Sequence, residues 1–87
     1  MDLAADDLFH APVKRSMTIA GHQTSITLEP LFWGLLQKAA SERALPLNAL
    51  VAQIDVARMD AAEPPGLATA IRLWLTKDLL GKTALSD

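Results

Sequence analysis

Residues 24–30 read Thr-Ser-Ile-Thr-Leu-Glu-Pro, and this stretch decides the fold. Ile26 and Leu28 alternate with Ser25 and Thr27, which is typical of a β-strand with one buried face and one polar face. The Glu-Pro pair that follows predicts the start of a helix, because proline is favoured at the first helical position and a carboxylate suits the positive end of the helix dipole. A short strand therefore passes directly into a helix.

Two helices are predicted after this strand, because apolar residues recur there at helical spacing. The first runs from residue 30 to about residue 43 and the second ends near residue 58 or 59. Pro46 separates them, since the residue before a proline is biased out of the helical region. The apolar positions are Phe32, Leu35 and Leu36 in the first helix and Leu47, Leu50, Val51 and Ile54 in the second.

Further elements are predicted on both sides of this unit. Residues 14–19 alternate again and predict a second strand, joined to the first as a hairpin by a four-residue connection at residues 20–23. A third helix is predicted after a break at Pro64, Pro65 and Gly66, with Gly81 as its stop. The expected organisation is a flexible arm at residues 1–12, a core at 13–59, a linker at 60–66, a C-terminal helix at 67–81 and a tail at 82–87.

The burial of the strand predicts an obligate dimer. A lone strand with two helices leaves its edges unpaired and its apolar face uncovered, and two copies solve both problems. The hydrophobic content of 51% and the mean hydropathy of +0.21 in a chain of 87 residues also favour a second subunit. The predicted dimer core consists of Ile26, Leu28, Phe32, Leu35, Leu36, Leu50, Val51 and Ile54.

Composition excludes several function classes. There is no cysteine, and His10 and His22 have no second ligand at metal spacing, so we expect no metal and no cofactor. No nucleophile elbow or glycine-rich phosphate loop is present, which argues against an enzyme. Acidic residues near the start and the lack of a long apolar run predict a cytoplasmic protein without a membrane segment.

The charge is unevenly distributed along the chain. The net charge is −2, but residues 8–28 contain no acid and carry Lys14 and Arg15. The remainder holds six of the eight bases and all ten acids, a balance of −4. The predicted hairpin is therefore the basic part of an acidic chain, which favours a partner that carries negative charge.

Several motifs together resemble a known family. They are Lys-Arg-Ser-Met-Thr-Ile-Ala-Gly-His at residues 14–22, the stretch at 24–30, Phe-Trp at 32–33, Leu-Asn-Ala-Leu-Val at 47–51, Ile-Asp at 54–55, and Leu67, Ala70, Ile71, Arg72, Leu73 and Trp74. Over roughly residues 14–80 the set resembles the ribbon-helix-helix DNA-binding proteins, and in particular a small bacterial branch of that family.

The resemblance implies a homodimeric transcriptional regulator whose β-ribbon enters the major groove of double-stranded DNA. By position, Gln23, Ser25 and Thr27 would read the bases. The amides that open the second helix, at Leu47 and Asn48, would hold a phosphate. Lys14 and Arg15, from the basic hairpin, are expected to contact phosphates as well.

The additional strand at residues 14–19 leaves the mode of binding open. If the later strands of two subunits pair, the sheet has four strands and is about 14 Å wide, against a groove of about 12 Å. Either the outer strands curl away and grip phosphates, or the ribbon serves another purpose. The alternative function is an antitoxin-like interaction module whose C-terminal helix, at residues 67–80, docks on a protein partner without specific DNA binding.

Overall fold

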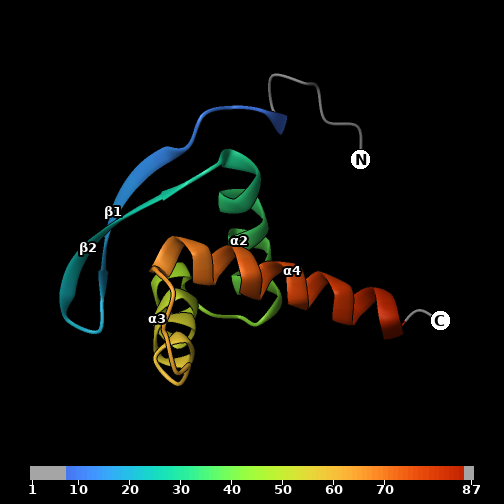
Figure 1. The fold of residues 1–87 in the computed structure, drawn as a ribbon. Helices are drawn as coiled ribbons and strands as arrows, with labels where there is room; N and C mark the ends of the chain where they lie inside the picture. Colours follow the sequence, from blue (N-terminus) through green and yellow to red (C-terminus); the bar gives the residue numbers. More distant parts are fainter. Residues whose placement is uncertain (1–7, 86–87) are drawn as a thin grey trace.

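The computed structural model describes residues 8–85 of the chain. The elements are the strands β1 (Val13–Ile19) and β2 (His22–Leu28) and the helices α2 (Pro30–Glu42), α3 (Leu47–Arg58) and α4 (Leu67–Leu85) (Figure 1). This order confirms the predicted fold class, which is mainly helical with a short β-ribbon, an additional N-terminal strand and a third helix. Residues 1–7 of the expected arm and 86–87 of the expected tail lie outside the described range.

The two strands form an antiparallel hairpin, and only Ala20 and Gly21 connect them. Their φ angles are 51° and 83°. Two positive φ angles are what a type I′ turn requires, and this turn matches the right-handed twist of paired strands. The predicted four-residue connection at residues 20–23 was therefore too long. Alanine here takes the conformation usually left to glycine or asparagine, so His22 and Gln23 join β2.

The junction between α2 and α3 lies where the sequence predicted a break between the two helices. Pro30 lies in the first turn of α2, as predicted. The helix ends where Ala44 takes a φ of 54° and the amide of Leu45 donates to the carbonyl oxygen of Ala40 at 2.9 Å. Pro46 is extended, with a ψ of 150°, and the next residue opens α3.

Helix α4 continues beyond the stop that was predicted at Gly81. Among the described glycines only Gly21 has a positive φ, so Gly81 stays helical. The Nζ of Lys82 lies 2.6 Å from Glu42 Oε1 of α2 and 3.2 Å from Asp78 Oδ2 of α4. The pair with Glu42 holds the last turns of α4 to α2, and the pair with Asp78 lies within α4 itself. The preference of glycine for helix ends, on which the prediction was based, takes no account of such contacts.

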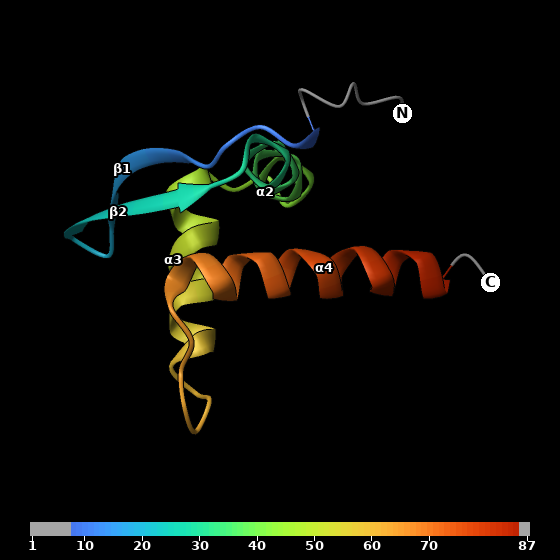
Figure 2. The ribbon, with the colours of Figure 1, turned by 45° about the horizontal axis from the view of Figure 1, so that its top comes forward.

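The inner face of the hairpin and the three helices share one hydrophobic core. β1 packs on α3, whereas β2 packs on α4 and α2. The hairpin arches to one side of the helices, and α4 crosses α3 and extends past it (Figures 1 and 2). The buried core residues are Ile19, Ile26, Leu28, Trp33, Leu36, Ala39, Ala40, Leu50, Val51, Ile54, Ala70, Ile71 and Leu75. None of the helices described within residues 8–85 is long and apolar enough to cross a bilayer.

The core closes within one chain, so the prediction of an obligate dimer from the burial of β2 is not supported. Ile26 and Leu28 are only 2% and 0% exposed in a single subunit. The strand is not alone, because β1 pairs with one of its edges and α4 packs on it. Burial of the strand therefore does not by itself require a second subunit.

Candidate nucleic-acid interface

The outer face of the hairpin gathers the residues that the sequence predicted to read DNA. Gln23, Ser25 and Thr27 alternate along β2 with residues that point into the core, and all three are exposed. Their partners across the hairpin lie on the same face, because directly opposed residues of an antiparallel pair point to the same side. The pairs are Thr18 with Gln23, Ser16 with Ser25, and Lys14 with Thr27. Ser16 and Thr18 are members of this face that were not predicted as site residues from the sequence.

This outer face is polar throughout. The six side chains of the three pairs are all exposed. The hydroxyls of Ser16 and Ser25 lie 3.5 Å apart, which agrees with their position side by side. Lys14 supplies the charge of this face, and hydroxyl and amide groups supply donors and acceptors. The arrangement suits a polar, negatively charged ligand.

The structure separates the two predicted phosphate contacts of β1. Arg15 lies opposite Ile26 and therefore belongs to the inner face, where its guanidinium carbon is 5.0 Å from the centre of the Trp33 ring. Trp33 is 2% exposed, and its indole N–H donates to the carbonyl oxygen of Val13 at 3.0 Å. Trp33 thus fixes the start of β1 and holds Arg15 at the edge of the hairpin, while Lys14 points outward.

The beginning of α3 lies beside the hairpin. The side-chain amide of Asn48 donates to the carbonyl oxygen of Thr18 at 3.4 Å, so it ties α3 to the end of β1. Within the described range, no side chain caps the N-terminus of α3. The first amides of a helix have no partner inside the helix, and Leu47 and Asn48 occupy these positions. Figure 2 shows α3 starting next to the hairpin and running away from it.

The predicted dimer-core residues lie in the core of a single chain. Six of the eight are buried there, and Phe32 and Leu35 are partly buried at its margin. The exposed large apolar side chains of the helices lie elsewhere. On α3 and its C-cap these are Val56, 69% exposed, and Met59, 59% exposed.

A second apolar face of α3 was missed by the sequence analysis. Val56 and Met59 continue a row that starts with Ala49 and Ala52, at the spacing i, i+3, i+7 and i+10. That spacing places the four residues on one side of a helix. The row was readable from the sequence, but the stronger row through Leu50 and Ile54 concealed it.

The acidic side chain that follows the ribbon forms an ion pair with an arginine. Glu29 directly follows β2, and its Oε1 accepts hydrogen bonds from Arg72 Nε at 3.0 Å and Nη2 at 2.8 Å. The pKa of Glu29 lies below its ordinary value of 4.5, because its carboxylate accepts a hydrogen bond from its own backbone and then from Arg72. The ion pair also joins the end of β2 to α4.

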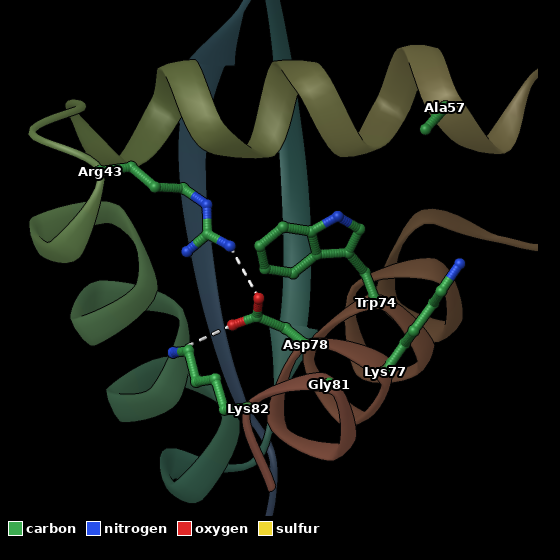
Figure 3. Close-up of a pocket in the computed structure, with 7 residues that line it drawn as sticks. All are labelled: Arg43, Ala57, Trp74, Lys77, Asp78, Gly81 and Lys82. Atoms are coloured by element: carbon green, nitrogen blue, oxygen red, sulfur yellow. Dashed lines mark hydrogen bonds and ion pairs between the residues drawn. The ribbon is translucent and has the colours of Figure 1, made fainter. Parts of the chain in front are cut away.

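A pocket lies between α4, the C-terminal part of α3 and the end of α2 (Figure 3). Asp78 is central in it, 2.7 Å from Arg43 Nη2 and 3.2 Å from Lys82 Nζ. Burial raises the pKa of Asp78, but hydrogen bonds from these two cations outweigh burial and hold the pKa below the ordinary value of 3.8. Arg43 also lies 4.8 Å from the ring centre of Trp74. These contacts fasten α4 to α2, and none of the predicted site residues lines the pocket.

Comparison with known proteins supports the same family as the sequence motifs. The family model described as the ribbon-helix-helix domain matches residues 12–79, which include the hairpin and nearly all of the helices. A search of curated proteins and a search of solved structures gave no match. Ribbon-helix-helix domains typically are DNA-binding or regulatory modules rather than enzymes, and they usually act as dimers. With the family model covering most of the chain and the fold in agreement, this protein belongs to the ribbon-helix-helix domain family.

Proposed function

We propose that this protein is a homodimeric, cytoplasmic regulator of transcription that reads the major groove of double-stranded DNA with its β-ribbon. The observation that carries the proposal is the outer face of the hairpin. It is exposed, polar and cationic, and residues 8–28 contribute no acid to it. Such a face is electrostatically matched to a phosphate backbone, and its short side chains can reach base edges.

In this proposal each group has a role that its chemistry allows. Gln23 can pair with adenine through two hydrogen bonds, and Ser25 and Thr27 can bond to either type of base. Lys14 lies at the start of the same face and is suited to a phosphate. The amides of Leu47 and Asn48, at the uncapped start of α3, are suited to a second phosphate.

The second apolar face of α3 supports dimerisation. Val56 and Met59 are large, apolar and more than half exposed, and the small residue Ala49 on the same side lets another helix approach closely. Ala52, in the same row, is partly buried against the core of its own chain. A helix that is apolar on two sides buries one side in its own core and needs a partner for the other. Two copies related by a twofold axis would cover this face with itself.

The deciding experiment is a mobility-shift assay at low salt with the promoter region of the protein's own gene. We expect retardation, and affinity that falls as salt rises. Replacing Lys14 with alanine removes one phosphate contact from each subunit, so the plot of log affinity against log salt should become less steep by about two for the dimer. Lys77→Ala, a cation removed from α4, is the matched control and should leave the slope unchanged. Absence of retardation by any DNA at micromolar protein would contradict the proposal.

The alternative function is a protein-interaction module, and one observation favours it. Leu73 and Leu80 lie seven residues apart on α4 and are 61% and 64% exposed, so that one side of this helix offers apolar surface. In this version α4 docks on a protein partner. Capture of a partner that is lost when both leucines are replaced by serine, together with no DNA binding, would support the alternative over the proposal.

A further inference from the structure

The pocket between α2, α3 and α4 has the size of a small-molecule site (Figure 3). Its volume is about 640 Å³, and sites for small ligands usually measure roughly 300–1,000 Å³. The hairpin contributes no residue to its wall, so the pocket is separate from the outer face that is proposed to bind DNA. A ligand held there would contact all three helices.

The wall of this pocket is positively charged. Its cationic side chains are Arg43, Lys77 and Lys82, and its carboxylate is that of Asp78. Asp78 binds Arg43 and Lys82, and Glu42 binds Lys82 from outside the wall. With Glu42 counted, three positive charges face two negative charges, which leaves a balance of +1. In a chain of net charge −2, this pocket attracts an anion that carries a single charge.

Lys77 supplies the positive charge that remains. It is exposed and forms no ion pair within residues 8–85, whereas Arg43 and Lys82 each have a carboxylate partner. Its ammonium carries three N–H donors on a flexible stem, so it can turn to meet a ligand in the pocket. Figure 3 shows Arg43 and Lys77 on either side of the Trp74 ring. An anion that binds to Lys77 therefore lies close to an aromatic surface.

Trp74 provides this aromatic surface. Its ring is partly exposed, and the guanidinium carbon of Arg43 lies 4.8 Å from the ring centre. Aromatic rings attract one another in offset or edge-on arrangements, because the face and the edge of a ring carry opposite partial charges. The pocket therefore favours a ligand that has a planar ring in addition to its charge.

Gly81 leaves open space in the wall of the pocket. It lies in α4, and a Cβ added to it would meet no atom within 4 Å. The space that a side chain would fill at this position is available to a ligand.

We propose that this pocket binds a small aromatic monocarboxylate. The carboxylate of the ligand accepts hydrogen bonds from Lys77, and its ring packs against Trp74 beside Gly81. Because the ligand contacts α4 together with the ends of α2 and α3, its binding stabilises the attachment of α4. The inference does not depend on DNA binding, since it rests on a different part of the molecule.

The test is isothermal titration calorimetry of the full chain at low salt with 2-naphthoate, which has two fused rings and one carboxylate. Two further probes separate the ring from the charge. The amide 2-naphthamide keeps the ring without the charge, and acetate keeps the charge without the ring. We expect 2-naphthoate to bind at one site per chain, and each of the other two probes to bind about five- to tenfold more weakly or less.

Two matched pairs of variants locate the site. Lys77→Met removes the charge and keeps an apolar stem, and Lys14→Met makes the same change at an exposed lysine of the hairpin. Gly81→Leu fills the open space of the pocket. Its control is Gly34→Leu, at an exposed position of α2 where an added Cβ also meets no atom within 4 Å. Circular dichroism checks that each variant remains folded.

We expect Lys77→Met to bind 2-naphthoate about five- to tenfold more weakly, because a charge-assisted hydrogen bond is lost. Gly81→Leu should weaken binding by about tenfold or more, and both controls should bind as the wild type does. The inference is wrong if 2-naphthoate gives no saturable heat at millimolar concentration. It is also wrong if 2-naphthamide or acetate binds as tightly as 2-naphthoate, or if either pocket variant binds like its control. The mobility-shift assay tests the proposed function separately.

Discussion

Ala44 adopts a backbone conformation that is unfavourable for alanine. It ends α2 with a φ of 54°, and the Leu45 amide closes the end of the helix on Ala40. An L-residue in the left-handed region costs roughly 1–2 kcal/mol, because its Cβ crowds the following carbonyl oxygen. The turn is nevertheless formed, since Pro46 cannot continue a helix from α2 and the core fixes where α3 begins. Ala44 therefore carries conformational strain that glycine would avoid.

Ala44→Gly is expected to stabilise the fold by about 1 kcal/mol, because glycine adopts the left-handed region without that clash. Ala57→Gly is the matched control. It makes the same change at an exposed helical position of α3 and should lower the free energy of unfolding by roughly 0.5–1 kcal/mol. Urea denaturation measures both. If both substitutions changed the free energy of unfolding in the same direction, this explanation of the turn would be wrong.

At the scale of elements, α4 is fastened by charge as well as by apolar contact. Arg72 binds Glu29, Lys82 binds Glu42 and Asp78, and Arg43 also binds Asp78. Hydrogen bonding to Lys82 lowers the pKa of Glu42 and hydrogen bonding to Glu42 raises the pKa of Lys82. The three carboxylates all have lowered pKa values, so their protonation weakens the attachment of α4.

Acid should therefore destabilise the protein through α4. A carboxylate with a lowered folded-state pKa contributes stability that is complete above its ordinary value, here 4.5 for glutamate and 3.8 for aspartate, and that is lost as pH falls through the folded value. The melting temperature should be level near neutrality and fall below about pH 4.5. Glu29→Gln should make this fall shallower, whereas Glu63→Gln, in the exposed linker, should retain the wild-type slope. If the melting temperatures of the wild type and both variants fall equally steeply at acidic pH, Glu29 does not have this role.

The elements themselves were largely predictable, and the exceptions have physical causes. Residues 24–30 gave the strand and the helix start, because alternation and proline act locally. The connection at Ala20 was misjudged because its backbone conformation is set by the twist of the strands that it joins. The end of α4 was placed too early because ion pairs from α2 act on Lys82. The outward position of Gln23, Ser25 and Thr27 followed from alternation, but their neighbours on β1 required the register.

At the scale of the whole molecule, a single chain encloses its core and leaves apolar surface on two helices. Val56 on α3 and Leu73 on α4 are exposed to similar extents, 69% and 61%. The sequence could not distinguish core from interface, because the predicted dimer core depended on what covers β2. β2 is covered by α4 as well as by α2, and only the tertiary arrangement reveals the contribution of α4.

Val56→Lys should convert the proposed dimer to a folded monomer, because a lysine in the centre of an apolar helix contact carries a charge that the contact cannot solvate. Leu73→Lys places the same charge on a similarly exposed leucine of α4 and should leave the dimer intact. Analytical ultracentrifugation gives the mass of each, and circular dichroism gives the fold. The proposed interface would be wrong if Val56→Lys remained dimeric or if Leu73→Lys alone dissociated.

Because the hairpin and α4 close the core within one chain, we expect each new subunit to fold before it meets another. In an obligate dimer, folding and association are one event, and stability depends on concentration. If the two events are separate in this protein, the amount of proposed dimer at low abundance rises with the square of the subunit concentration. Occupancy of a promoter would then respond to synthesis as a threshold: a scarce protein stays folded but silent, and a modest increase in its production engages the DNA.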